Sequence, residues 1–226
     1  MIKDIYLLVG GEATRLRPLS EGIPKALLTI KGKLLIDLIL ENLDKSNLEN
    51  INLICSIKHE KFWLEYKKNS QFNVNLHFEH EKLDTAGFVV QNINNFSDKF
   101  LCMNGDLLIE MNFNSFLEVA NNSKNSTICS IPVDDPSRYG VLELDGTKII
   151  NFIEKPEDMK YGNNISLGVY CLHKKDIKEI KDKLETSCSF EKNVFPNLVD
   201  NNLLDCFIAE ANMLDVGTRE SYIYAH

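Results

Sequence analysis

The sequence predicts an α/β protein built on a doubly wound, mixed and mostly parallel sheet. Between residues 5 and 79, short apolar runs typical of buried strands alternate with segments whose apolar residues recur at helical spacing. From residue 127 onward one strand pattern follows another, which indicates a mixed extension of the sheet. No segment repeats with a period of roughly 20 to 50 residues, so a solenoid is excluded.

The composition is that of an ordinary globular chain. The 226 residues are 44% hydrophobic and 26% charged, which suits one α/β domain or two small ones. No apolar run approaches the ~20 residues of a spanning helix, and the first residues lead into a strand, so we expect no signal peptide and no membrane association. Six scattered cysteines without CxxC spacing predict buried, reduced thiols in the cytosol and argue against a zinc site.

The first half of the chain predicts a βαβαβ unit. Its strands are expected at 5–9, 51–57 and 74–79, and its helices at 34–47 and 59–68. A further helix should begin near Thr85, with Asp84 or Thr85 as its N-cap. Another apolar strand runs from Phe100 into Asn104-Gly105-Asp106, and an aspartate at the carboxyl end of a strand is a natural Mg²⁺ ligand for a bound triphosphate.

The second half predicts strands within 127–133, 139–146, 148–156 and 164–172. Asp145-Gly146 lies between two alternating runs and predicts a hairpin turn. Gly140 and Gly168 lie in or next to strands, where a missing side chain lets a ligand approach. Two helices should follow at 174–184 and 190–199, the second capped by Ser189.

The chain is organised around residues 10–25, GGEATRLRPLSEGIPK, which follow the first strand directly. Gly10 and Gly11 let the backbone approach a phosphate that a side chain would exclude. Arg15, Arg17 and Lys25 concentrate positive charge in a chain of net charge -8, which indicates a localised anionic ligand and not a nucleic-acid surface. The spacing differs from that of the Walker P-loop.

This stretch resembles the signature loop of the sugar-1-phosphate nucleotidylyltransferases, GGxGTRLRPLTxxxPKP, although Ala13 replaces a glycine. Further segments resemble the family in the same order: 79–87 (ExxPLGTAGA), 104–106 (NGD), 154–156 (EKP), the glycine-tyrosine strand 166–170, and 214–218 (DIGT). The resemblance implies a Rossmann-like nucleotide-diphospho-sugar transferase fold. It further implies one domain over 1–226, with a nucleotide-binding half at about 1–125 and a sugar-phosphate-binding half at about 126–226.

The resemblance also implies a role for individual residues. Arg15, Lys25 and Asp106 would be catalytic, with Arg15 on the β- and γ-phosphates and Lys25 between the α-phosphate and the acceptor. Asp106 and Asp215 would hold Mg²⁺. The nucleotide would contact Gly10, Gly11, Thr14, Arg15, Glu79, Thr85, Gly87 and Asp106. The sugar phosphate would contact Gly140, Glu154, Lys155, Ser166 and Gly168, with Ser166 where the family has asparagine.

The implied reaction joins a nucleoside triphosphate to a sugar 1-phosphate and releases pyrophosphate. The motifs are closest to those of heptose and mannose 1-phosphate guanylyltransferases, and this implies a cytoplasmic enzyme of surface polysaccharide biosynthesis, compatible with a homodimer. We expect GTP because the Glu79 carboxylate can accept from both adjacent guanine donors. Uridylyl or cytidylyl transfer, a phosphorylated non-sugar acceptor, and a catalytically silent nucleotide-sugar sensor all remain open alternatives.

Overall fold

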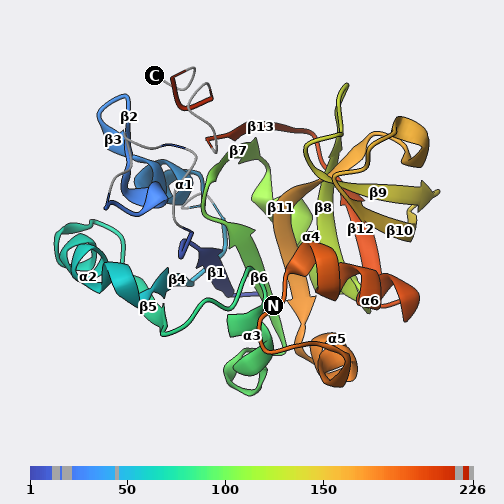
Figure 1. Ribbon diagram of the computed structural model, residues 1–226, viewed down its shortest axis with the longest axis horizontal. Coiled ribbons are helices and arrows are strands. Elements are labelled where there is room, and N and C mark those ends of the chain that lie inside the picture. Colours follow the sequence, from blue (N-terminus) through green and yellow to red (C-terminus); the bar gives the residue numbers. More distant parts are fainter. Residues whose placement is uncertain (12–15, 17–21, 44–45, 217–220, 224–226) are drawn as a thin grey trace. The chain divides into compact units, whose positions relative to one another are not determined.

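A computed structural model describes residues 1–11, 16, 22–43, 46–216 and 221–223 (Figure 1). The chain forms two compact units. The first unit comprises Lys3–Lys82, Met103–Phe113 and Ala211–His226, and the second comprises Met1–Ile2, Leu83–Cys102 and Asn114–Glu210. Each unit is therefore assembled from separate stretches of sequence. No helix in these described ranges is long and apolar enough to cross a membrane.

The first unit contains the parallel strands that the sequence predicts. They are β1 (Asp4–Leu8), β4 (Asn50–Ser56) and β5 (Val74–Glu79), in the order β5-β4-β1. Leu7 pairs with Leu53, and Leu53 with Leu76, so the carboxyl ends of the strands meet at one edge. Ile5 and Leu7, and the intervening Tyr6, are all buried, as expected of a strand covered on both faces.

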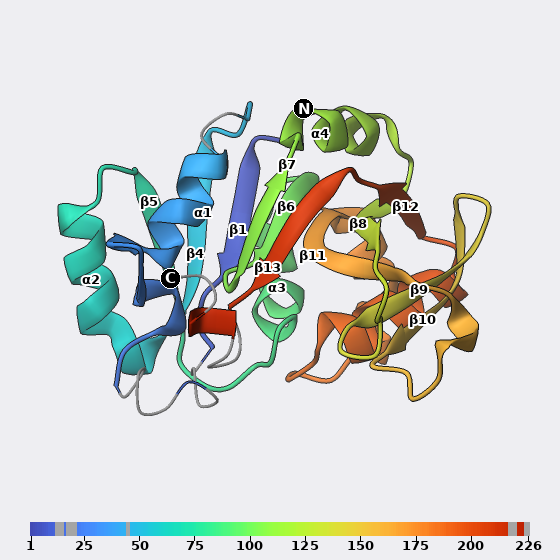
Figure 2. The ribbon, with the colours of Figure 1, turned by 90° about the horizontal axis from the view of Figure 1, so that it is seen from above.

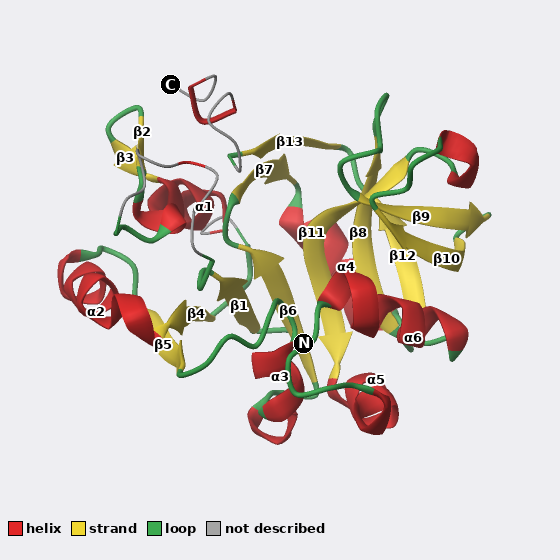
Figure 3. Cartoon of the chain, viewed as in Figure 1, coloured by secondary structure: helices red, strands yellow, loops and turns green. Residues whose placement is uncertain are grey.

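Two helices and a second ladder complete the first unit (Figure 2). Helix α2 (Glu60–Asn69) packs against β4 and β5, and α1 (Leu35–Leu43) packs against β7 (Leu107–Met111). Strand β7 pairs antiparallel with β13 (Ala211–Asp215). A small hairpin of β2 (Thr29–Ile30) and β3 (Lys33–Leu34) lies beside α1 (Figure 3). Strand β6 (Lys99–Asn104) has residues in both units.

The strands of the second unit pair mainly antiparallel. Their order is β11 (Asn164–His173), β8 (Ser126–Pro132), β12 (Leu204–Ile208), β10 (Lys148–Glu154) and β9 (Gly140–Asp145). Among the described strand pairs of this unit, only β8 and β12 run parallel. A mixed sheet is confirmed, but "mostly parallel" describes only the strands β5-β4-β1 of the first unit. The predicted turn at Asp145-Gly146 joins β9 to β10 directly, and so short a connection requires antiparallel strands.

Helices and aromatic rings form the core of the second unit. The helices are α3 (Gly87–Gln91), α4 (Phe113–Asn122), α5 (Lys174–Ile180), the π-helix Phe190–Val194 and α6 (Phe195–Asp200). The ring of Phe195 lies 4.8 Å from Tyr170, 5.1 Å from Phe152 and 5.6 Å from Phe190. Ser189 caps the π-helix as predicted. Its hydroxyl accepts hydrogen bonds from the amides of Glu191 and Lys192.

The predicted N-cap of α3 is wrong. The helix begins at Gly87, and the residue at its cap position, Ala86, has no side chain that could accept a hydrogen bond. Asp84 adopts a left-handed backbone conformation with φ of 60°, and its Oδ1 accepts from the Thr85 amide. The Thr85 hydroxyl donates to Glu191 and accepts from the Phe190 amide. Its oxygen, which a local cap would use as acceptor, is thus bound to a distant segment.

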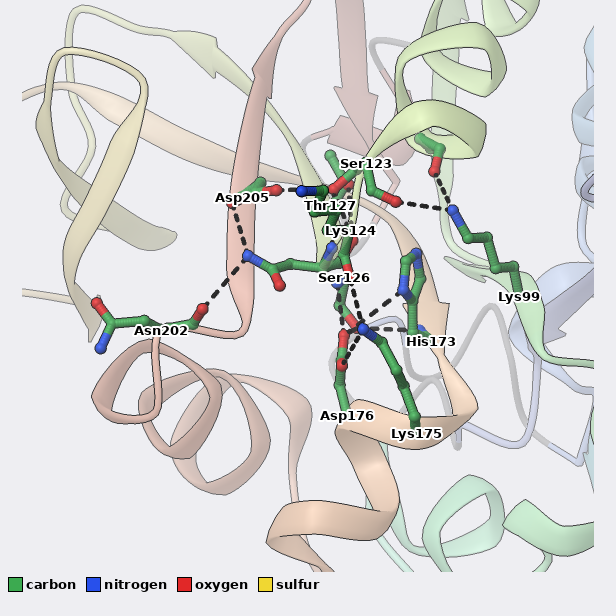
Figure 4. A network of polar contacts seen from close by, with 12 residues as sticks. Lys99, Ser123, Lys124, Ser126, Thr127, His173, Lys175, Asp176, Asn202 and Asp205 are labelled. Atoms are coloured by element: carbon green, nitrogen blue, oxygen red, sulfur yellow. Dashed lines mark hydrogen bonds and ion pairs between the residues drawn. The ribbon is translucent and has the colours of Figure 1, made fainter.

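A buried polar network fixes the connection between α4 and β8 (Figure 4). Asp176 accepts from the amide and the hydroxyl of Ser126 at 2.7 and 2.9 Å, and the Ser126 hydroxyl accepts from the His173 amide at 2.9 Å. Lys99 donates to the carbonyls of Ala120, Asn121 and Ser123. The His173 imidazole is 3% exposed, and its Nε2 has no hydrogen-bond partner among the described residues. Burial lowers the pKa of His173 to about 4.

His173 predicts an acid-dependent loss of stability. The unfolded chain binds the imidazole proton near pH 6.5, whereas the fold disfavours it down to about pH 4. Stability should therefore fall as the pH falls through this window, by up to about 1.4 kcal/mol per unit. Urea unfolding of wild type and His173→Gln between pH 7 and 4.5 measures this, and the variant should show the shallower slope. Asp176, whose pKa burial raises, is present in both proteins and acts in the opposite sense. Equal slopes would exclude His173 as the source.

Gly105 predicts a second stability effect. A Cβ on Gly105 would lie 2.4 Å from Val9 Cγ1 and 2.8 Å from the Leu8 carbonyl oxygen, while the Gly105 amide donates to that same carbonyl. Gly105→Ala must push the turn away from β1 and should lower the free energy of unfolding by about 1–3 kcal/mol. Gly11→Ala is the control, because no described atom lies within 4 Å of a Cβ there. Equal stability of the two variants in urea denaturation would contradict this account.

Candidate active site

An ion cluster in the first unit joins three of the predicted site residues. Lys25 opens a short 3-10 turn directly after Pro24, and only 9% of the residue is exposed. Its Nζ lies 2.8 Å from Asp106 Oδ2 and 4.0 Å from Asp215 Oδ1. The side chains of Asp106 and Asp215 are 41% and 24% exposed, so solvent reaches both carboxylates. A buried ammonium group thus faces two accessible carboxylates.

The β7–β13 ladder brings these two aspartates together. Asp106 lies in the turn before β7, and Asp215 ends β13. In the antiparallel register Asp215 pairs with Leu107, the residue after Asp106. The Val216 amide then donates to the Asp106 carbonyl at 3.2 Å. Residues far apart in sequence therefore become neighbours through backbone pairing, which no local pattern reveals.

The donor set of this cluster fits Mg²⁺. Two carboxylates near one cation offer hard oxygen ligands, and Mg²⁺ usually takes one or two carboxylates, with phosphates and water completing its shell. The described part of the chain contains no group of three or more His, Cys, Asp or Glu side chains placed to hold a metal. Asp106 and Asp215 would therefore hold the ion together with a bound triphosphate, not in a cage made by the protein alone.

Gly10 and Glu79 also meet in the first unit. Both lie just beyond or at the carboxyl ends of parallel strands, and a Cβ on Gly10 would lie 2.8 Å from Glu79 Oε2. The glycine therefore leaves the space that the carboxylate occupies. Burial, and to a lesser extent the Glu79 charge, raises the pKa of the neighbouring Cys55 thiol. Gly11 is exposed, whereas Thr14, Arg15 and Arg17 lie outside the described residues.

The second unit gathers the residues predicted to bind the sugar phosphate on adjacent strands. Glu154 at the end of β10 pairs with Gly140 at the start of β9, and the next residue of β9 pairs with Ile165, directly before Ser166. A Cβ on Gly140 would lie 2.4 Å from the Phe152 ring and 3.2 Å from a Glu154 carboxylate oxygen. A side chain at position 140 would therefore clash with Phe152, which is reason enough for a glycine there without any role in ligand binding.

Lys155 has a strained backbone. Its φ is 51°, which is uncommon for a residue with a side chain, and its amide donates to the Tyr139 carbonyl at 2.9 Å. Its Nζ donates to the carboxylate of Glu154, and 61% of the side chain is exposed. Backbone strain of this kind clusters at functional sites. Glycine would adopt this backbone conformation with less strain than lysine.

Ser166 and Gly168 lie at an irregularity of β11. The pairing of β11 with β8 shifts register between Ser166 and Tyr170, and Gly168 adopts φ of 74°. The Gly168 amide donates to the Ser166 hydroxyl at 3.4 Å. Such bulges turn a side chain away from the regular pleat and are frequent next to active sites.

Thr85 and Gly87 lie in the second unit. The Thr85 hydroxyl donates to Glu191 Oε2 at 3.0 Å and accepts from the Phe190 amide at 2.9 Å. A Cβ on Gly87 would lie 2.6 Å from the Thr186 carbonyl oxygen, so this glycine is required by close packing. In the sequence, the position of Glu191 after Ser189 indicates only the start of a helix.

Comparison with known proteins agrees with the predicted resemblance. The family model described as "Nucleotidyl transferase" matches residues 5–226. A protein of Sulfolobus acidocaldarius, provisionally named mannose-1-phosphate guanyltransferase, is 34% identical over 222 residues, with coverage of 96% of this chain and 60% of that protein. The mannose-1-phosphate guanyltransferase of Hypocrea jecorina is 31% identical over 227 residues, with coverage of 96% and 61%. The chain thus spans about 60% of the length of these relatives.

A solved structure matches over almost the whole chain. The crystal structure of HddC from Yersinia pseudotuberculosis in complex with GMP-PN has a TM-score of 0.81 and 29% identity, and the match covers 99% of this chain and 98% of HddC. The ordered motifs, the paired aspartates beside Lys25 and these matches agree, and the chain belongs to the nucleotidyl transferase family.

Proposed function

We propose that this chain is a sugar-1-phosphate nucleotidylyltransferase that uses GTP and a manno-configured hexose or heptose 1-phosphate. The observation on which this depends most is the cluster of Lys25, Asp106 and Asp215 in the first unit. An ammonium group beside two carboxylates suits a triphosphate that arrives with a divalent cation. Relatives named mannose-1-phosphate guanyltransferases, and a similar structure that contains GMP-PN, support the choice of GTP and of the sugar.

In the proposed reaction, a phosphate oxygen of the sugar 1-phosphate attacks the α-phosphorus of the triphosphate. The new bond is phosphorus to oxygen, the bond to the bridging β-phosphate oxygen breaks, and pyrophosphate leaves with that electron pair. The acceptor is already an anionic nucleophile, so the protein has to position the reactants and neutralise charge. A divalent cation held by Asp106 and Asp215 would supply positive charge to the phosphates.

The predicted site residues take different parts in this proposal. Lys25 would contact the α-phosphate and the acceptor phosphate, and Arg15 the departing phosphates. Gly10, Gly11, Thr14 and Gly87 would border the nucleotide through their backbone or a small side chain. Lys155 would hold the acceptor phosphate, and Glu154, Ser166, Gly140 and Gly168 the sugar. We also propose that the chain is one domain, in which residues 1–125 form the nucleotide-binding half and residues 126–226 the sugar-phosphate-binding half.

Location and assembly are also part of the proposal. All six cysteines are unpaired, and five of them are buried. Free thiols of this kind suit a reducing compartment, so we keep a cytoplasmic enzyme, without a nucleic-acid or membrane partner, as the expectation. A homodimer and a place in surface polysaccharide biosynthesis remain predictions.

A substrate matrix tests the function itself. Purified protein should be incubated with Mg²⁺, each of four nucleoside triphosphates and a panel of sugar 1-phosphates, and pyrophosphate release measured. GTP with a manno-configured acceptor should give the highest kcat/KM. A preference for UTP or CTP would move the assignment to uridylyl or cytidylyl transfer. If no turnover were measured but nucleotide sugars bound, the assignment would change from an enzyme to a catalytically silent nucleotide-sugar sensor.

Lys25→Met should reduce turnover by at least ~100-fold while the fold stays intact, because it removes a cation aimed at developing charge in a shielded position. Lys33→Met is the matched control, since Lys33 also pairs with a carboxylate, Glu41, at 2.7 Å but lies on the exposed β3. Turnover of both variants is measured at saturating substrates, with circular dichroism to verify folding. A folded Lys25→Met variant with the turnover of Lys33→Met would remove Lys25 from the active site.

Glu79→Gln should weaken selectivity for GTP over UTP. The carboxylate can accept from both guanine donors, whereas the amide offers an acceptor to one and a donor to the other. Roughly 1 to 3 kcal/mol of discrimination should be lost. The measurement is the ratio of kcat/KM for the two triphosphates, with Glu81→Gln as the control because Glu81 is exposed in the loop that directly follows β5. An unchanged ratio would remove Glu79 from base recognition.

A further inference from the structure

Glu191 in the second unit binds three segments with one carboxylate. It lies in the first turn of the π-helix Phe190–Val194. Its Oε2 accepts from the Thr85 hydroxyl at 3.0 Å and from the Ser189 hydroxyl at 2.7 Å, and its Oε1 accepts from the Tyr170 hydroxyl at 3.5 Å. The carboxylate therefore links the loop before α3, the start of the π-helix and strand β11.

This contact occupies the only hydrogen-bond donor of the Thr85 side chain, so that donor is not available to a ligand. A hydroxyl has one proton, and that proton goes to Glu191, while the oxygen accepts from the Phe190 amide. Thr85 thus cannot donate to a nucleotide while this contact holds. What the contact does fix is the backbone on either side of Thr85.

Backbone bonds attach the same loop to the same partner segment. The Ala86 amide donates to the Cys188 carbonyl at 2.9 Å, and the Cys188 amide donates to the Leu83 carbonyl at 3.1 Å. Gly87 lets the Thr186 carbonyl approach without a clash. Residues 83–87, here called the base loop, are therefore held along residues 186–191, and Glu191 supplies the charged end of that attachment.

The carboxylate also reaches the strand that holds Ser166 and Gly168. Tyr170 follows the bulge of β11, is 1% exposed, and packs its ring against Phe190 and Phe195. Hydrogen bonds to an ionised acceptor are about twice as strong as neutral ones, and connected networks hold one arrangement. A neutral side chain at position 191 would loosen the base loop and its link to β11 together.

We propose that Glu191 is a positioning residue for nucleotide binding, acting by holding the base loop through Thr85. The proposal rests on the proposed function, because it takes the base loop to border the nucleotide base. It assigns Thr85 an indirect role: the hydroxyl serves Glu191, and the loop backbone meets the base. A positioning role of this kind affects affinity for the triphosphate more than the chemical step.

The kinetic test uses Glu191→Gln and Thr85→Val, which keep the side-chain shapes. Each should raise KM for the triphosphate about 10-fold and change kcat and the KM for the sugar 1-phosphate much less. The double variant should be no worse than the more affected single variant, because both act on the same contact: Glu191→Gln removes its charge and Thr85→Val removes its donor. Thr85→Ser should restore most of the affinity lost in Thr85→Val. Glu179→Gln, an exposed carboxylate on α5, is the control. Unchanged KM values, or effects that add, would overturn the proposal.

Hydrogen exchange of the folded protein gives a second readout that needs no turnover. The Ala86 amide donates to the Cys188 carbonyl, and the Val90 amide donates to the Ala86 carbonyl. Both amides should exchange faster in Glu191→Gln and Thr85→Val than in wild type. Unchanged exchange would reject the attachment even if KM rose. If wild type transferred no nucleotide, the proposed function would fail, and exchange would still decide whether Glu191 holds the loop. If Glu191→Gln did not fold, the comparison of Thr85→Val with Thr85→Ser would decide.

Discussion

The arrangement of the first unit depends on one electrostatic constraint: Lys25 is almost buried, and a buried ammonium group needs anionic partners. Asp106 and Asp215 supply them, and each comes from a different part of the chain. The turn between β6 and β7 must stay tight to present Asp106, and β13 must pair with β7 to present Asp215. The signature loop, the NGD turn and the last strand are therefore mutually dependent.

Position in the sheet explains how much of the fold was predictable. Strand β1 and the segment Leu53–Cys55 of β4 are apolar runs because both faces are covered, and such runs are visible in sequence. Strand β13, with the sequence ANMLD, is half exposed, and its pattern resembles a loop. It becomes a strand because its backbone pairs with β7, and this pairing is a tertiary contact that the local sequence does not reveal. The antiparallel course of the second unit could be predicted only at Asp145-Gly146, where the turn itself fixes direction.

The candidate site divides in the same way. Asp106 and Glu79 lie at strand ends and Lys25 ends the signature loop, and at these positions sequence patterns and family resemblance coincide. The meeting of Asp106 with Asp215 depends on strand register, and no spacing in the sequence contains it. Thr85 shows the opposite case. Its local signal was real, since threonine is a good N-cap, but its oxygen accepts from the Phe190 amide instead of an amide of α3, while its proton goes to Glu191. Local rules fail where a distant segment offers a side chain other partners.

The interleaving of the two units has a consequence for how the protein can be made. The first unit takes its final ladder from Ala211–Asp215, after the chain has passed through the whole second unit. A nascent chain that has reached residue 210 has therefore made the second unit but leaves β7 without the β13 partner. An unpaired strand edge is a template for association with other chains. A chain that ends between β7 and β13 lacks both this partner strand and the Asp215 carboxylate of the ion cluster.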